Sequence, residues 1–266
     1  MAKNLRFLID LDGVIYRGNT LLPGSKEFLE KISSAGYSYA LVTNNSTRTP
    51  KQVAEKLHGL GIWVDENRIV TSAIATAKWL CKQAPSGARV MVVGAAGLFE
   101  AIFTPENRFV PDWDNPEWVV AGTDFDITYN KLKMACLAIQ KGANFVATNL
   151  DTTYPSEEGL IPGAGALLGV ITAVTGKKPI VIGKPEPNLY RIALDFLPPD
   201  GEVIVIGDRL DTDIEAGKRL GFTTVLVLTG VSTQKDIIAS HCKPDYVFNT
   251  LYDLLQSLLE GRFPAN

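Results

Sequence analysis

Two aspartates at the end of an apolar stretch are the first residues that could do chemistry. The segment FLIDLDG, residues 7–13, passes from apolar side chains into Asp10, Asp12 and Gly13. Short unbroken apolar runs are typical of strands that are buried in parallel sheets. Two carboxylates at the mouth of such a strand repel each other and lose water together. The arrangement therefore requires a compensating positive charge.

Further apolar stretches also end in polar residues: Thr43 with Asn44, Lys184, and Asp208. In an open parallel sheet, ligands bind at the carboxyl edge, where the strands end. If Asp10, Asp12 and Asp208 meet at that edge, a divalent cation offsets their repulsion, and Mg²⁺ is the usual ion where phosphate is present. Each residue alone has an ordinary alternative, because aspartate and asparagine often form turns or cap helices.

The residue types separate into roles for phosphoryl transfer. Asp10 can attack phosphorus through a carboxylate oxygen. Asp12, beyond the tight bend, can protonate the departing oxygen and then take a proton from water. Neutral and positive donors suit the oxygens of a transferred phosphoryl group, and the chain offers Thr43, Asn44 and Lys184.

The elements that must position these residues follow an alternating pattern of apolar strand-like runs and amphipathic helical stretches. Such alternation predicts an α/β fold with a doubly wound, mainly parallel sheet. Polar breaks that carry Pro or Gly, at 82–87 and 175–179, indicate domain boundaries. We therefore expect a discontinuous catalytic core of residues 1–81 and 180–266, with an inserted α/β unit at 82–179.

The composition limits the classes of function. The chain has 266 residues, of which 46% are hydrophobic and 21% charged, and its formal net charge is −3. That balance argues against nucleic-acid binding. The scattered cysteines and the two histidines form no zinc motif. No apolar run is long enough to span a bilayer and the N-terminus lacks the pattern of a signal peptide, so we expect a cytoplasmic enzyme without a membrane partner.

Together the motifs resemble those of the haloacid dehalogenase (HAD) superfamily of phosphotransferases. In chain order they are DLDGVIY (10–16), LVTNNS (41–46), GKPEP (183–187) and GDRLDTDI (207–214). Residues 128–179 are similar to the C2-type cap of the branch that contains NagD and the p-nitrophenylphosphatases. The resemblance covers nearly the whole chain and implies a Rossmann-like HAD core with an inserted α/β cap.

The resemblance also implies a Mg²⁺-dependent phosphatase that works through an aspartyl-phosphate intermediate. Asp10 would be the nucleophile and Asp12 the general acid and base. Asp10, the backbone carbonyl of Asp12, and Asp208 would hold Mg²⁺. Asp213 would lie next to these ligands and orient them without binding the ion itself. The dehalogenases of the superfamily lack the second carboxylate, so Asp12 favours phosphate ester hydrolysis.

The remaining implied roles concern the phosphate and the substrate. Thr43, Asn44 and Lys184 would hold the phosphate. In the cap, residues 149–155 are the candidate segment to face the substrate, although turn chemistry explains Asn149 and Asp151 equally well. The expected substrates are small phosphomonoesters: p-nitrophenyl phosphate, a nucleotide, phosphoglycolate, pyridoxal phosphate or a sugar phosphate. Caps of this type often pair, so a homodimer through the cap is a further expectation.

Two other functions are compatible with the same core. A phosphomutase would keep water from the phosphoenzyme and would yield an isomerised ester instead of inorganic phosphate. A non-catalytic phospho-acceptor, or a protein that only binds a phosphometabolite, also places aspartates and a lysine at a sheet edge. Asp12 argues against that class, because a long-lived acyl phosphate gains nothing from a placed acid and base.

Overall fold

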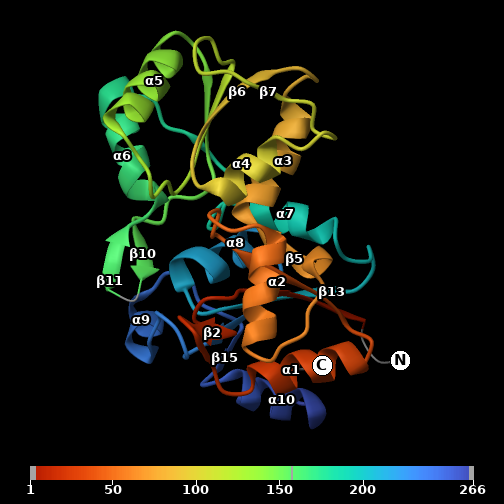
Figure 1. The fold of residues 1–266 in the computed structure, drawn as a ribbon. Coiled ribbons are helices and arrows are strands. Elements are labelled where there is room, and N and C mark those ends of the chain that lie inside the picture. Colours follow the sequence, from red (N-terminus) through yellow and green to blue (C-terminus); the bar gives the residue numbers. More distant parts are fainter. Residues whose placement is uncertain (1–3, 157, 264–266) are drawn as a thin grey trace. The chain divides into compact units, whose positions relative to one another are not determined.

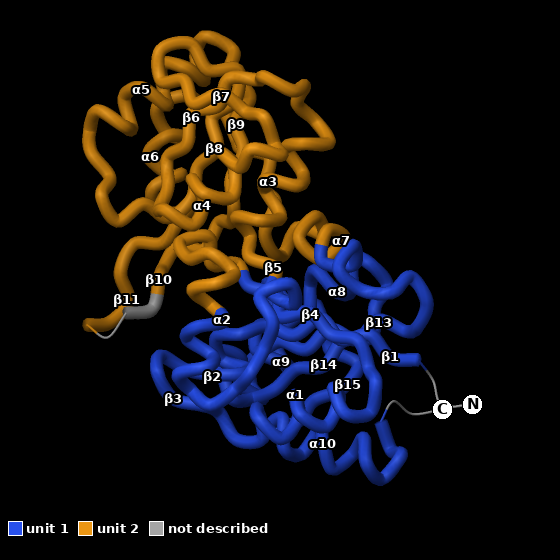
Figure 2. Tube along the Cα trace, turned by 45° about the vertical axis from the view of Figure 1, so that its right-hand side comes forward, with its two compact units in different colours: residues 1–43, 54–69, 193–266 blue, residues 44–53, 70–192 orange. Residues whose placement is uncertain are grey.

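The protein is described by a computed structural model that covers residues 4–156 and 158–263 (Figure 1). Its chain divides into two compact units, each formed by segments that are far apart in the sequence (Figure 2). Unit 1 comprises Met1–Thr43, Ala54–Ile69 and Ala193–Asn266, and unit 2 comprises Asn44–Val53 and Val70–Ile192. The α/β fold class expected from the alternating pattern is confirmed in both units.

The main sheet has six strands in the order β15-β14-β13-β1-β4-β5. Their bounds, in that order, are Tyr246–Phe248, Thr223–Val227, Glu202–Gly207, Leu5–Ile9, Ser38–Thr43 and Ile69–Thr71. Strand β1 pairs in parallel with β13 on one side and with β4 on the other. Ile9 lies opposite Ile206 of β13 and Leu41 of β4, so all three strands end at one carboxyl edge.

Several short elements complete unit 1. They are the hairpin strands β2 (Tyr16–Arg17) and β3 (Thr20–Leu21), the 3₁₀ turn η1 (Glu66–Arg68), the π-helical turn η2 (Leu210–Ile214), and the helices α1 (Ser25–Ser34), α8 (Glu215–Arg219), α9 (Gln234–Ala239) and α10 (Leu251–Leu259). Helix α1 buries Phe28, Leu29 and Ile32 and packs against α10 (Figure 1). Helices α2 (Pro50–Gly59) and α7 (Asn188–Leu194) each begin in unit 2 and end in unit 1.

Unit 2 is built on a five-stranded sheet in the order β12-β9-β8-β6-β7, and its pairs are parallel. Their bounds, in that order, are Ile180–Val181, Asn144–Ala147, Trp118–Ala121, Arg89–Val93 and Val110–Pro111. The unit also contains the antiparallel hairpin β10 (Thr153–Ser156) and β11 (Gly159–Pro162) and the helices α3 (Ser72–Gln83), α4 (Ala96–Ile102), α5 (Tyr129–Gln140) and α6 (Ala164–Thr175).

The sheet of unit 2 is covered on both faces. Figure 1 shows α5 and α6 on one side and α3 and α4 on the other. Met91, Val119 and Phe145 belong to the buried cluster that also contains Leu168 and Ile171 of α6. Burial on both faces explains why these strands are almost entirely apolar.

The two compact units differ in extent from the domains expected from the sequence. Residues 44–53, 70–81 and 180–192 group with unit 2, whereas the polar breaks in the sequence predicted that they belong to the core. Strand β12 shows this directly, because Ile180 and Val181 lie opposite Val146 and Ala147 of β9. The division into a catalytic core and a specificity cap stays a prediction.

Within the described part of the chain, no helix combines the length and apolar character needed to cross a membrane.

Candidate active site

Three buried carboxylates meet in unit 1 at the carboxyl edge of the main sheet. Asp10 follows β1, Asp208 follows β13, and Asp213 lies in the turn η2. Each offers one oxygen, and these oxygens lie within 4.8 Å of one another. The three residues are 7%, 2% and 1% exposed, respectively. We call these residues the carboxylate cluster.

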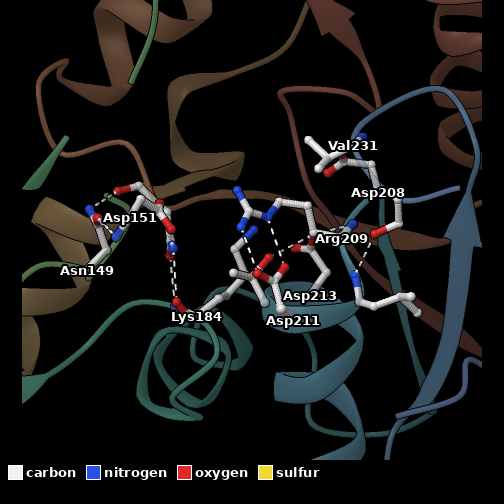
Figure 3. A network of polar contacts seen from close by, with 12 residues as sticks. Asn149, Asp151, Lys184, Asp208, Arg209, Asp211, Asp213 and Val231 are labelled. Carbon is white, nitrogen blue, oxygen red and sulfur yellow. Dashed lines mark hydrogen bonds and ion pairs between the residues drawn. The ribbon is translucent and has the colours of Figure 1, made fainter. Parts of the chain in front are cut away.

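Backbone groups surround the carboxylate of Asp208. Its Oδ2 accepts a hydrogen bond of 2.7 Å from the backbone N–H of Val231 (Figure 3). A Cβ added to Gly230 would lie 1.8 Å from that oxygen, and one added to Gly13 would lie 2.4 Å from it. Only glycine fits at either position. Gly13 also has a φ of +81°, which side chains with a Cβ rarely adopt.

Asp213 is held by the turn that carries it. Its Oδ2 accepts a hydrogen bond of 3.3 Å from the backbone N–H of Arg209. The Arg209 guanidinium binds Asp211 through two hydrogen bonds, of 3.1 and 2.8 Å, and these bonds hold the pKa of Asp211 below its usual value (Figure 3). Asp211 is therefore engaged by its own arginine, and Asp213 alone of the turn's two aspartates joins the cluster.

Asp12 has a different environment from Asp10, although only one residue separates them. Asp12 is exposed, and its backbone forms a bridge with Tyr16. The N–H of Gly13 donates a hydrogen bond of 2.8 Å to the carbonyl of Tyr16, which closes the bend after β1. The bend therefore directs the first aspartate into the interior and leaves the second in contact with solvent.

Thr43 is the last residue of β4, the strand beside β1. It is 6% exposed. Because Leu41 lies opposite Ile9, Thr43 reaches the same sheet edge as Asp10. The parallel register thus brings together the first aspartate, the predicted threonine and Asp208, as the pattern of polar strand ends indicated.

In unit 2, Asn44 holds the backbone of Lys184. The Asn44 Nδ2 donates to the Lys184 carbonyl at 3.0 Å, and its Oδ1 accepts from the Lys184 N–H at 2.8 Å. The same Nδ2 donates to Asp151 Oδ2 at 3.1 Å. Lys184 is 3% exposed, and its Nζ lies 5.9 Å from the centroid of the Tyr190 ring. Asn44 therefore contacts two of the other predicted residues through one side-chain amide.

Asn149 contacts the same region. It is 3% exposed, and its Nδ2 donates to the Asn44 carbonyl at 2.7 Å. Its Oδ1 accepts from the backbone N–H of Asp151 at 3.0 Å, which is the turn contact that the sequence offered as an alternative (Figure 3). Ser72 adds a hydrogen bond of 2.5 Å from its hydroxyl to the Asn44 carbonyl.

Some residues around the predicted site were not predicted from the sequence. Gly230 and Val231 contact Asp208, and Ser72 contacts Asn44, yet none lies within a predicted motif. The sequence feature that could have indicated Gly230 is its position at the end of the apolar run TTVLVLTG, residues 223–230. It marks a fourth strand end near the same edge, but a lone Gly after a strand is also an ordinary turn signal.

The carboxylate cluster suits a hard divalent cation. Buried carboxylates at this separation are mutually repulsive, and the donor atoms are all oxygens. Oxygen ligands are those that Mg²⁺ and Ca²⁺ select, whereas the cluster contains no thiolate or imidazole for a softer metal. The residues present therefore fit the metal that the resemblance implies.

Comparison with known proteins places this geometry in a family. Residues 7–104 match the family model described as haloacid dehalogenase-like hydrolase, and residues 181–254 match one described as HAD-hydrolase-like. An acid sugar phosphatase of Staphylococcus aureus is 41% identical over 259 residues, which cover 97% of this chain and 99% of the relative. The chain belongs to the haloacid dehalogenase-like hydrolases. The family predicted from the motifs is thereby confirmed.

Solved structures of this HAD-like group share the fold. The 4-nitrophenylphosphatase of Thermotoga maritima has a TM-score of 0.88 and is 36% identical, over 96% of this chain and 97% of that chain. The glycerol phosphate phosphatase of Mycobacterium tuberculosis, solved in complex with magnesium, has a TM-score of 0.88 and is 35% identical, over 95% and 76%. The predicted enzyme class, a phosphatase of the p-nitrophenylphosphatase-like branch, is confirmed by these relatives.

Proposed function

We propose that this HAD phosphatase hydrolyses small phosphomonoesters with the help of Mg²⁺ and through a phosphorylated Asp10. The observation that carries the proposal is the carboxylate cluster, in which three buried acidic side chains share one sheet edge. Such a cluster is costly without a cation, and a cation there is adjacent to the residue proposed to attack phosphorus.

The metal ligands are proposed from the family motif and the donor set. Asp10, the backbone carbonyl of Asp12, and Asp208 would hold Mg²⁺, while Asp213 supports them from the turn η2. The bound cation would supply positive charge to the phosphoryl oxygens and reduce the repulsion among the carboxylates. The mycobacterial glycerol phosphate phosphatase has been solved with magnesium and with calcium, so a divalent cation in a protein of this fold supports the proposal.

The reaction then proceeds in two displacements. A carboxylate oxygen of Asp10 forms a bond to phosphorus as the bond to the ester oxygen breaks. Asp12 donates its proton to the departing alcohol or phenol, and then accepts a proton from water as that water attacks phosphorus. The second displacement breaks the bond between phosphorus and Asp10 and releases inorganic phosphate. The exposure of Asp12 supports this role, because its carboxyl group must accept a proton from a water molecule.

We propose that Thr43, Asn44 and Lys184 hold the phosphate. Lys184 supplies a positive charge, and Thr43 supplies a hydroxyl donor at the edge beside Asp10. The Asn44 side chain also binds the Lys184 backbone and Asp151, so it would position the lysine as well. Asn149 and Asp151 fix the first turn of the segment 149–155, which stays our candidate for contact with the leaving group.

The substrate class is narrowed by the relatives. The similar proteins are named acid sugar phosphatase, glycerol phosphate phosphatase and 4-nitrophenylphosphatase. We therefore propose a sugar or polyol phosphate as the substrate in the cell and p-nitrophenyl phosphate as the assay substrate. A homodimer through the predicted cap and a cytoplasmic location stay predictions.

Replacement of Asp10 tests the proposal. Asp10→Asn keeps the shape but removes the attacking carboxylate, so turnover of p-nitrophenyl phosphate should fall on the order of 10⁶-fold, as for other covalent nucleophiles. Asp200→Asn, at an exposed position of unit 1, is the matched control and should retain activity. An Asp10→Asn enzyme that turns over at the wild-type rate would overturn the nucleophile assignment.

A second assay addresses the type of reaction. The purified protein is offered a panel of sugar, polyol and nucleotide phosphates with and without Mg²⁺, and inorganic phosphate is measured. Release of phosphate that requires Mg²⁺ supports the hydrolase. Formation of an isomerised ester without phosphate release would indicate a phosphomutase instead.

A further inference from the structure

We propose that residues 229–231, which follow β14 after one intervening residue, act as a positioning segment for the metal ligands. The inference rests on the Mg²⁺ site proposed above and adds residues that lie outside the four motifs. Its basis is that three consecutive residues of this segment contact both chain segments that would supply metal ligands.

Thr229 anchors the bend that contains Asp12. Its hydroxyl donates a hydrogen bond of 2.6 Å to the carbonyl of Gly13, across 216 residues of sequence. The peptide unit of Gly13 follows directly after Asp12, whose backbone carbonyl is the proposed ligand. Loss of this hydrogen bond would therefore remove one of the contacts that hold the bend and would loosen the direction of that carbonyl.

Gly230 and Val231 position the carboxylate of Asp208. The N–H of Val231 donates to Asp208 Oδ2 at 2.7 Å. Gly230 approaches so closely that a Cβ there would lie 1.8 Å from the same oxygen. The chain then continues to Ser232, whose N–H donates to the Asp208 carbonyl at 3.0 Å. The side chain of Asp208 is thus held by the positioning segment, and its backbone by the next residue along the chain.

Arg17 holds the positioning segment from the hairpin of β2 and β3. Its Nη2 donates to the carbonyls of Thr229, at 2.5 Å, and Gly230, at 3.3 Å. Arg17 itself is exposed, so its replacement should leave the core intact. The hairpin, the bend after β1 and the positioning segment therefore form one hydrogen-bonded assembly around Asp208 in unit 1.

The expected effect is on metal affinity. Mg²⁺ requires nearly ideal octahedral geometry, so small rotations of its ligands weaken binding. Groups that orient metal ligands typically change affinity or activity by 10- to 100-fold when they are replaced. Thr229 contacts one ligand segment and leads into the two residues that contact the other.

Titration calorimetry with MgCl₂ on the purified full chain tests the inference without an activity assay. Thr229→Val removes the hydroxyl at nearly constant volume and should raise the dissociation constant of Mg²⁺ about 10-fold. Thr229→Ser keeps the hydroxyl and should stay within about 2-fold of wild type, by the same reasoning. Arg17→Gln provides a second variant at an exposed position. We expect a loss of about 3-fold, smaller than the roughly 10-fold loss for a direct contact, because Arg17 acts only through the positioning segment.

Two controls separate this inference from the proposed function. Arg219→Gln removes an exposed arginine that pairs with Glu215, and its Mg²⁺ affinity should equal that of wild type. Asp208→Asn should lose Mg²⁺ binding. If Asp208→Asn loses binding while Thr229→Val and Arg17→Gln bind as wild type does, the inference is wrong and the metal site stands. If the wild-type protein does not bind Mg²⁺, the proposed metal site and the inference about the positioning segment are both wrong.

Discussion

The side-chain amide of Asn44 is hydrogen-bonded to both the N–H and the carbonyl of Lys184. The two distances are 2.8 and 3.0 Å, and the amide nitrogen also donates to Asp151 at 3.1 Å. The amide thus resembles a backbone partner in a sheet, because it satisfies the donor and the acceptor of one residue. The backbone of Lys184 is thereby held at a defined position before the ammonium group of the side chain binds any ligand.

Replacement of Asn44 should weaken catalysis through Lys184. Asn44→Ala removes these three hydrogen bonds and lets the lysine shift, so KM for p-nitrophenyl phosphate should rise and kcat should fall. We expect a loss of about 10- to 100-fold in kcat/KM, because a displacement of about 1 Å in a positioned group can cost about 10²-fold. Steady-state kinetics beside Lys184→Ala measures this. The two variants should change KM and kcat in the same direction.

Asn67→Ala is the control for Asn44→Ala, because Asn67 is exposed in unit 1. Its kinetics should match those of wild type. Wild-type kinetics for Asn44→Ala itself, in a folded protein, would show that the hydrogen bonds from Asn44 to the Lys184 backbone have no role in turnover.

Replacement of Asp12 should separate metal binding from proton transfer. Asp12→Asn keeps the backbone carbonyl proposed as a ligand and removes the group that transfers protons, so kcat should fall about 10²- to 10⁴-fold. The dissociation constant for Mg²⁺, measured by calorimetry, should change little. A large loss of Mg²⁺ affinity in this variant would mean that the side chain, not the carbonyl, binds the ion.

Mg²⁺ should raise the thermal stability of the protein. A ligand that binds only the folded state at 100 times its dissociation constant adds about 2.7 kcal/mol to the free energy of unfolding. The midpoint of thermal unfolding should therefore increase with Mg²⁺ and return on addition of EDTA. Asp208→Asn should remove the increase, and Asp200→Asn should retain it. An equal increase in wild type and Asp208→Asn would place the ion elsewhere.

Cys242 should make the protein less stable at alkaline pH. Burial, together with the hydrogen bond and charge of Glu215, raises the pKa of the Cys242 thiol to about 11. The unfolded chain ionises this thiol near its ordinary value of about 9, whereas the folded chain keeps it neutral up to about 11. The stabilising contribution is complete below pH 9 and is lost as pH rises from 9 to 11.

Urea unfolding across this range measures the loss. Cys242→Ala should show a smaller decrease in the free energy of unfolding between pH 9 and 11 than wild type does. Cys81→Ala, which replaces an exposed thiol and leaves Cys242 in place, should retain most of the decrease. Identical pH profiles for wild type and Cys242→Ala would contradict the assignment.

The strand ends could be predicted because buried parallel strands are nearly continuous apolar runs. Asp10, Thr43 and Asp208 each follow such a run, and a parallel register brings them to one edge. The same reasoning could not show that Asp213 joins the cluster, because this depends on the π-helical turn η2. No hydrophobic periodicity marks a single π turn.

Contacts made through backbone groups could not be predicted from the sequence either. The N–H of Val231 and the close approach of Gly230 to Asp208 depend on the path of a loop, not on side-chain type. Strand β12 has only Ile180 and Val181, and two apolar residues do not reveal which sheet they join. The extents of the two compact units therefore differ from the boundaries inferred from polar breaks.

The central position of β1 has a consequence for synthesis of the protein. The N-terminal strand has its β4 partner within the first 43 residues, but its partner on the other side is β13, which begins at Glu202. During translation one edge of β1 lacks its native neighbour until residues 202–207 have been made. Asp10 and Asp208 can therefore meet only after the ribosome has released that late strand, and earlier truncated products should be unable to transfer phosphate.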